Sequence, residues 1–295
     1  MEASDILKRI RKIEITTKNM VNEMFSGEYH SLFKGQGLEF SEVREYQMGD
    51  SFRQIDWNVT AKMRHPYIKK FEETRELNVM FLVDASASTI FGTKNSLKSE
   101  YITEITAVLS FSALSNNDKV GLMLFTDEVE KYLPPRKGSK YALRMIRDIL
   151  YFEPKHTQTD IAKAAEYIYR VTKKKSIIFV ISDFSDEKDY WSPLKLLAKK
   201  HDLIAIRITD KAETELPKAG LIYFSDPETG KKVAINTSSK KIRREYYNLA
   251  MKEEEDLKEK FKRSRIDFIN LQTDQNYVKE LLKFFKLRIK MKNQR

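Results

Sequence analysis

Hydroxyl and carboxylate side chains follow an apolar run near residue 80. Asp84, Ser86 and Ser88 stand at alternate positions directly after the apolar residues 79–83. Alternate side chains in a segment that leaves a strand point to the same side, so these three can converge on one point. Their oxygens are hard ligands of the kind that Mg²⁺ and Mn²⁺ prefer. The pattern predicts a divalent-cation site, and the simpler alternative is that these residues only cap a turn or a helix.

Two later segments supply further oxygen ligands for the same site. Asp183 follows a second apolar run at residues 176–182, and residues 157–160, Thr-Gln-Thr-Asp, open a predicted helix. The carboxyl ends of parallel strands meet at one edge of a sheet, which is where such sheets bind ligands. We therefore expect these segments to lie beside the loop that begins at Asp84.

Apolar runs and helical spacing alternate along the chain from residue 78 onward. Strands are predicted at residues 79–83, 120–125, 176–182, 203–209 and 266–271, with an edge strand at 129–133. Helices are predicted at residues 97–114, 139–151, 160–171, 193–200, 240–262 and 275–287, and a hairpin around residues 226–230. Strands that alternate with helices imply right-handed crossovers. The sequence therefore predicts an α/β fold with a doubly wound, mostly parallel, Rossmann-like sheet.

The first 76 residues differ in character and are expected to form an appendage. Residues 4–25 have helical spacing, whereas residues 26–76 show no sustained period. We expect an N-terminal helix and irregular helical/β appendage at 1–76, an α/β domain at 77–290 and a basic tail at 291–295. Asp50, Arg53, Asp56 and Trp57 could form a catalytic cluster, but a structural network is the favoured interpretation. In this network Arg53 pairs with a carboxylate and Trp57 anchors the appendage on the core.

The composition excludes several classes of protein. The chain has 295 residues and no cysteine, which excludes disulfides, thiolate metal sites and a cysteine nucleophile. A hydrophobic fraction of 41% excludes an extended disordered chain. The longest apolar runs have strand length, well short of the roughly 20 residues that span a bilayer. The N-terminus also lacks the apolar stretch of a signal peptide, so we expect a cytoplasmic protein.

A basic excess remains to be assigned. The 54 Lys and Arg outnumber the 43 Asp and Glu, which gives a net charge of +11. Residues 131–147 hold six basic residues and no acid, and six more basic residues follow Glu280. Such runs usually form a solvated helix face. The tail also alternates with apolar residues, so it suits an acidic partner or peripheral contact with an anionic membrane.

The order of the candidate ligands resembles a known site. The motif Asp-x-Ser-x-Ser at 84–88, with a later Thr and a later Asp, is similar to the metal-ion-dependent adhesion site of von Willebrand factor A domains. The resemblance implies that Ser86, Ser88 and Thr159 coordinate Mg²⁺ or Mn²⁺ directly. It also implies that Asp84 and Asp183 hold the ion mainly through waters.

The same resemblance bears on the two threonines and on the chemistry. Thr159 is preferred to the competing Thr157 because it precedes Asp160, as in the Thr-Asp loops of many such domains. Few formal charges neutralise the ion, so it stays electrophilic and short of one ligand. A carboxylate from a partner protein would fill that position. This is the chemistry of adhesion, in which no bond is broken.

The N-terminal segment carries a second resemblance. Residues 27–31 (GEYHS), 33–35 (FKG), 39–40 (EF), 44–46 (REY), 49–50 (GD), 53–58 (RQIDWN) and 66–69 (PYIK) are similar to the bacterial family known as domain of unknown function 58. Members join such a segment to a von Willebrand-type domain, so the resemblance covers nearly the whole chain. It implies a partner among the AAA-type ATPases of the MoxR class, beside which the family is commonly encoded.

We therefore expect a non-catalytic, metal-dependent interaction module that acts as an adaptor or co-chaperone. One alternative is a metal-dependent phosphatase or hydrolase on the same kind of sheet. It is disfavoured because Ser86 stands where a haloacid-dehalogenase-type enzyme needs its second Asp, and because the chain has no phosphate-binding loop or nucleophile elbow. The other alternative is a basic scaffold on membrane or nucleic acid, whose binding would collapse as salt rises.

Overall fold

The computed structural model describes residues 38–48, 50–52, 55–73, 76–87, 98–186, 188–225 and 232–293. Four sequence predictions lie outside these residues. They are the helix at residues 4–25, the pairing of Arg53 with a carboxylate, the position of Ser88, and the turn of the hairpin at residues 226–230.

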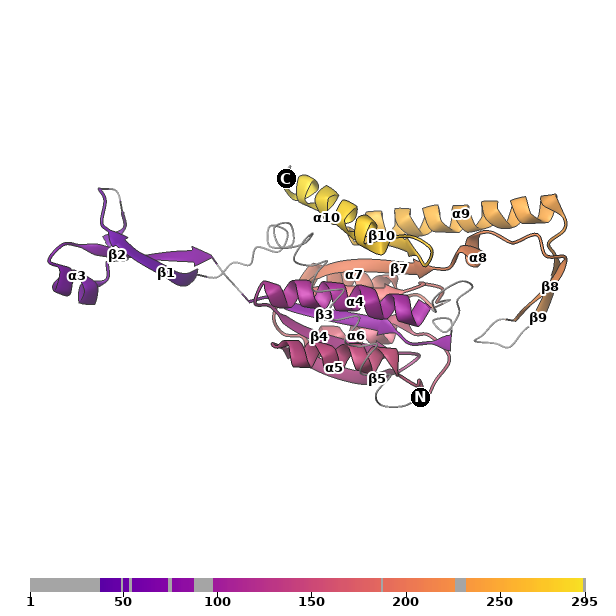
Figure 1. The fold of residues 1–295 in the computed structure, drawn as a ribbon, viewed down its shortest axis with the longest axis horizontal. Coiled ribbons are helices and arrows are strands. Elements are labelled where there is room, and N and C mark those ends of the chain that lie inside the picture. Colours follow the sequence, from indigo (N-terminus) through magenta and orange to yellow (C-terminus); the bar gives the residue numbers. More distant parts are fainter. Residues whose placement is uncertain are drawn as a thin grey trace.

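A six-stranded sheet forms the centre of the molecule (Figure 1). Its strand order is β10-β7-β6-β3-β4-β5. The strands are β3 (Asn78–Asp84), β4 (Lys119–Phe125), β5 (Val129–Arg136), β6 (Ile177–Ser182), β7 (Asp202–Thr209) and β10 (Asp267–Gln272). All neighbours pair in parallel except β4 and β5, which pair antiparallel at one edge. The structure confirms the doubly wound, mostly parallel sheet and the edge strand that the sequence predicts.

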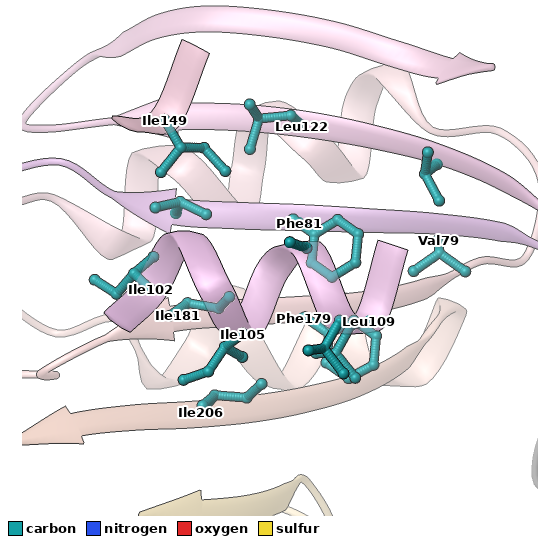
Figure 2. Packing of buried hydrophobic residues seen from close by; sticks show 14 of the residues in the cluster. Val79, Phe81, Ile102, Ile105, Leu109, Leu122, Ile149, Phe179, Ile181 and Ile206 are labelled. Atoms are coloured by element: carbon teal, nitrogen blue, oxygen red, sulfur yellow. The ribbon is translucent and has the colours of Figure 1, made fainter. Parts of the chain in front are cut away.

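Two layers of helices cover the sheet. One face packs against α4 (Lys98–Ser115), α5 (Ser139–Leu150) and α10 (Tyr277–Asn293), and the other against α6 (Ile161–Val171), α7 (Trp191–Lys200) and α9 (Lys240–Arg263). Figure 2 shows Ile102, Ile105 and Leu109 of α4 lying over Phe81 of β3 and neighbouring strand residues. The sheet is therefore buried on both sides, which is why its strands read as continuous apolar runs.

Alternation along β3 divides its side chains between the two layers. Val79, Phe81 and Val83 belong to the core on the α4 side, whereas Met80 and Leu82 belong to the core on the α6 side. Each side chain that is fully buried in this way contributes about 1.5–3 kcal/mol to stability. The packing fixes the register of β3 and so fixes where its carboxyl end emerges.

The C-terminal helix is tied to the sheet by a buried arginine. Arg288 of α10 is 2% exposed. Its Nε donates to Asp267 Oδ2 of β10 at 2.6 Å, and its guanidinium also pairs with Asp202 of β7. The helix continues to Asn293, past the predicted end near residue 287. One of the six basic residues that follow Glu280 is thus paired inside the fold and does not lie on a solvated face.

A small β-sheet with a short helix precedes the main sheet. β1 (Leu38–Glu45) pairs antiparallel with β2 (Tyr67–Glu73), and α3 (Trp57–Met63) lies between them in sequence. Arg44 donates to Asp50 at 2.7 Å, and the Asp56 carboxylate caps α3. These contacts are structural, as expected. The anchoring role predicted for Trp57 is wrong, because this side chain lies in the first turn of α3 and is 69% exposed.

The segment between β7 and β10 contains three more elements. A short helix, α8 (Lys211–Thr214), follows β7 and was not predicted. β8 (Leu221–Ser225) and β9 (Lys232–Asn236) pair antiparallel and confirm the predicted hairpin. In Figure 1 this hairpin lies beyond the carboxyl ends of β3 and β7, beside the start of α9. Within the described part of the chain, every helix is too short or too polar to cross a membrane.

Candidate functional site

The carboxyl ends of β3 and β6 lie side by side at the switch point of the sheet. The chain leaves β3 through α4 toward β4, whereas β6 pairs with β3 on the opposite side. A crevice opens where crossovers leave neighbouring strands in opposite directions, and open α/β sheets bind their ligands there. β3 ends in Asp84, and β6 ends in Ser182 followed by Asp183. The topology therefore brings two of the predicted ligands to one place.

The Asp84 carboxylate joins the two strand ends. Its Oδ1 accepts from the Ser86 backbone N–H at 2.9 Å, and its Oδ2 accepts from the Ser182 hydroxyl at 2.6 Å. The Ser182 hydroxyl in turn accepts from the Phe184 backbone N–H at 3.0 Å. Both oxygens of Asp84 thus accept hydrogen bonds from protein donors.

Burial and a neighbouring charge act on the same carboxyl. Asp84 is 1% exposed, and the charge of the Asp183 carboxylate acts on it. Burial, and then repulsion by the Asp183 carboxylate, raise the pKa of Asp84 to about 7, although the hydrogen bonds from Ser182 and Ser86 act in the opposite direction. The edge of the sheet therefore holds a buried pair of carboxylates whose charges repel each other.

The loop after β3 and the loop before α6 are joined by their backbones. The Ala87 backbone N–H donates to the Thr157 carbonyl at 3.1 Å. Ser86 is fully buried, Thr159 is 7% exposed, and Thr157 is exposed. Asp160 caps α6 by accepting from Lys163 N at 2.8 Å, so its carboxylate is committed to the helix. Burial at the joined loops thus distinguishes Thr159 from Thr157.

Asp183 lies in a sharp turn at the end of β6. Its Oδ1 accepts from the Ser185 backbone N–H at 3.1 Å. The next residue, Phe184, has a φ of 58°. This left-handed conformation costs a bulky residue about 1 kcal/mol or more. The turn is held by the bond from Ser182 and by the Tyr190 hydroxyl, which donates to the Phe184 carbonyl at 3.2 Å.

A buried lysine faces this carboxylate. Lys98, at the start of α4, is 2% exposed, and its Nζ lies 3.6 Å from Asp183 Oδ2. The same ammonium forms an ion pair with Glu213 of α8, whose side chain is 32% exposed. Burial raises the pKa of the Glu213 carboxyl, and the Lys98 charge opposes that rise. Lys98 therefore places a buried positive charge beside Asp183.

The structure gathers the described candidates at one edge of the sheet. Asp84, Ser86, Thr159 and Asp183 are all buried, and they come from three loops that converge as predicted. Among the described residues, no group of three or more His, Asp or Glu side chains could hold a metal ion. Any ion here would depend on hydroxyl ligands, and a set of carboxylate and hydroxyl oxygens fits Mg²⁺ or Mn²⁺.

Sequence reasoning missed three residues of the site. Ser182 was seen only as the end of a strand, although the two strand ends are linked through its hydroxyl. Lys98 and Glu213 gave no signal, because a lysine at a helix start and a glutamate in a charged segment usually lie in solvent. Only the tertiary contact between α4 and the β6 and β7 loops reveals them.

The family of the chain follows from a comparison with protein-family models. The model described as "Protein of unknown function DUF58" matches residues 42–256, which is most of the chain. The chain belongs to the DUF58 family. The match includes β3, β6 and both strand ends of the candidate site.

Relatives of this DUF58 protein extend over almost its whole length. The uncharacterised protein Rv1480 of Mycobacterium tuberculosis is 27% identical over 279 residues, which is 93% of this chain and 87% of the relative. Among solved structures, an aerotolerance-related membrane protein from Bacteroides fragilis aligns with a TM-score of 0.50 at 16% identity. That alignment covers 73% of this chain and 99% of the other.

The von Willebrand factor A domain of SpRpn10 is also similar to this DUF58 protein. It aligns with a TM-score of 0.40 at 12% identity over 70% of this chain and 94% of that domain. The mostly parallel sheet between two helical layers is the doubly wound α/β fold that the sequence predicts.

Proposed function

We propose that this DUF58 protein is a non-catalytic interaction module that grips an acidic residue of a partner protein through a divalent cation. The observation that carries the proposal is the buried set of oxygens at the switch point, from Asp84, Ser86 and Asp183. Hydroxyls and carboxylates suit Mg²⁺ or Mn²⁺, and a shell with few charges leaves the ion able to take one more carboxylate. Binding requires no step in which a bond is broken.

The described contacts suggest a division of roles among the ligands. Asp84 has protein donors on both oxygens and would act through water, whereas the hydroxyls of Ser86 and Thr159 would coordinate directly. Ser88 would complete the direct ligands. Thr159 is favoured over Thr157 by its burial.

The partner we propose is an AAA-type ATPase of the MoxR class, with this chain as adaptor or co-chaperone. This part of the proposal rests on the resemblance of the N-terminal segment and on membership of the family. We also propose a cytoplasmic location for this chain and its partner.

Binding to the purified ATPase of the same organism, with Mg²⁺ and with chelator, tests the proposal. We expect the complex to form only with Mg²⁺, and Ser86→Ala or Asp183→Asn to weaken it about tenfold or more. Asp274→Asn is the matched control, because this carboxylate is exposed at the carboxyl end of β10 in the same sheet. If the chain still binds the ATPase in chelator and in both site variants, the metal has no part in binding.

A pair of threonine variants tests the ligand assignment. Thr159→Ala is expected to weaken Mg²⁺-dependent binding, and Thr157→Ala is expected to leave it unchanged. The reverse result would assign Thr157. A generic phosphoester assay separates the module from an enzyme, since turnover that is lost in Asp84→Asn would favour a hydrolase.

A further inference from the structure

The ammonium group of Lys98 lies beside Asp183, a carboxylate that the proposed cation would also need. Lys98 Nζ is 3.6 Å from Asp183 Oδ2, and the side chain is 2% exposed. A buried ammonium is costly unless it is paired, so the carboxylates of Asp183 and Glu213 are what hold it there. Two acidic partners therefore share one internal cation.

The two partners of Lys98 differ in what else they do. Asp183 lies at the switch point beside Asp84, and its Oδ1 is held by the Ser185 backbone. Glu213 lies on α8, and its side chain is 32% exposed. The ammonium can thus pair more closely with Asp183 at the strand ends or with Glu213 on α8.

A divalent cation held by Asp183, directly or through one water, would lie within a few ångströms of this ammonium. Like charges at such a distance repel strongly, even at the effective dielectric constant of a protein surface. The ion and Lys98 therefore compete for the same carboxylate. Glu213 offers the ammonium an alternative partner when the ion is bound.

We propose that Lys98 is an internal competitor of the divalent cation, and that Glu213 receives its ammonium when the cation binds. The Lys98–Glu213 pair then sets the affinity of the site for metal. This inference rests on the proposed function, since it concerns the same site. It predicts that substitutions at Lys98 and at Glu213 change the affinity for the metal in opposite directions. Neither residue belongs to the proposed ligand set.

Mn²⁺ binding to the full chain, followed by the electron paramagnetic resonance signal of free Mn²⁺, tests the competition. Lys98→Met removes the competing charge and keeps the length of the side chain, so Mn²⁺ should bind about tenfold more tightly or better. Glu213→Gln leaves the ammonium with Asp183 alone, so Mn²⁺ should bind several-fold more weakly. Lys119→Met is the matched control, because Lys119 lies at the start of β4, at the opposite end of the sheet, and pairs with Glu76 at the surface. It should bind as the wild type does.

The outcomes separate this inference from the proposed function. If the wild type binds Mn²⁺ and Lys98→Met binds no more tightly, the competition is absent and the metal-dependent module stands. If Lys98→Met binds Mn²⁺ and the wild type does not, the competition is real and the natural chain uses its lysine in place of a metal. If neither binds, both ideas fail. Glu213→Gln gives a second reading if Lys98→Met does not fold, because unchanged affinity in that variant also overturns the competition.

Discussion

Ser182 makes two bonds with one hydroxyl and so links the ends of β3 and β6. It donates to Asp84 at 2.6 Å and accepts from the Phe184 backbone at 3.0 Å, and it is fully buried. Ser182→Ala leaves a buried carboxylate oxygen and a buried N–H without this partner. Loss of such a bond costs about 1–3 kcal/mol.

We therefore expect Ser182→Ala to lower the free energy of unfolding by about 1–3 kcal/mol in urea denaturation. Ser185→Ala, at an exposed position three residues further on, should change it by less than about 0.5 kcal/mol. Equal effects from the two substitutions would mean that the link through Ser182 is not a significant source of stability.

His201 gives the fold a dependence on pH. Its ring is 3% exposed, and its Nδ1 accepts from the Ser176 backbone N–H at 3.2 Å. Burial lowers the pKa of His201 from 6.5 to about 4. Between these values the unfolded chain binds a proton that the folded chain excludes. Stability is therefore expected to fall as pH drops from about 6.5 to about 4.

The variant His201→Asn keeps an acceptor for Ser176 and removes the titrating ring. Its stability should vary less with pH in this window, by on the order of 1–2 kcal/mol after allowance for solvent screening. Thermal unfolding of both proteins across the window measures the difference. Parallel pH profiles of stability for the two proteins would exclude His201 as the origin of the pH dependence.

Residue identities alone predicted part of the site. Asp84 and Asp183 were predicted because each directly follows an apolar run of strand length, and position after a strand is visible in a sequence. Lys98 was not, because burial of a lysine depends on carboxylates far away in the chain. The exposure of Trp57 was also missed, since an aromatic residue usually indicates a core position.

Among the elements, α10 depends on one ion-pair cluster for its attachment to the sheet edge. Arg288 contacts acids on both β7 and β10 and is 2% exposed. Removal of the guanidinium leaves two carboxylates, Asp202 and Asp267, close together without their shared cation. Breaking a buried pair of this kind costs about 3–5 kcal/mol.

Arg288→Met should therefore destabilise the protein by about 3 kcal/mol, because Met replaces the packing of the side chain but not its charge. Amide hydrogen exchange should show faster exchange in α10 first. Lys283→Met, on an exposed position of the same helix, is the control and should have little effect. A stable Arg288→Met protein with slow exchange in α10 would show that apolar packing alone holds this helix.

The main elements were predictable because their signals are local. The runs at residues 79–83 and 176–182 have no polar interruption, and burial on both faces of a parallel sheet requires such runs. The four-residue helix α8 was missed because four residues are too few to show a repeating apolar pattern. α10 was predicted to end too early because its last turns are rich in lysine and carry little apolar signal.

At the scale of the molecule, the β8–β9 hairpin is the part of the α/β region least joined to the sheet. Leu221 and Tyr223 of β8 and Val233 of β9 are all exposed, and Figure 1 shows the hairpin beyond the carboxyl ends of the main strands. A two-stranded ribbon contributes little stability to the sheet it adjoins. Thr237, in contrast, is fully buried and fastens the base of the hairpin to Gly220.

Replacement of residues 222–235 by a short Gly/Ser linker should therefore leave the midpoint of thermal unfolding within about 4 °C of the wild type. Thr237→Ala should cost more, because it removes a buried hydroxyl with two backbone partners, Gly220 and Ala219. Collapse of the fold on replacement of the hairpin would mean that the ribbon is part of the core structure.

The two tryptophans of the chain lie in opposite surroundings, and this gives the molecule two separate optical signals. Trp57 is exposed on α3, whereas Trp191 is half-buried against Phe261 and Tyr190, in the segment that follows Asp183 and Phe184. Indole emission shifts to shorter wavelength in an apolar setting, so the two contributions can be told apart. A ligand that rearranges the turn at Asp183 should change the short-wavelength component alone, which makes the unlabelled protein its own fluorescent reporter.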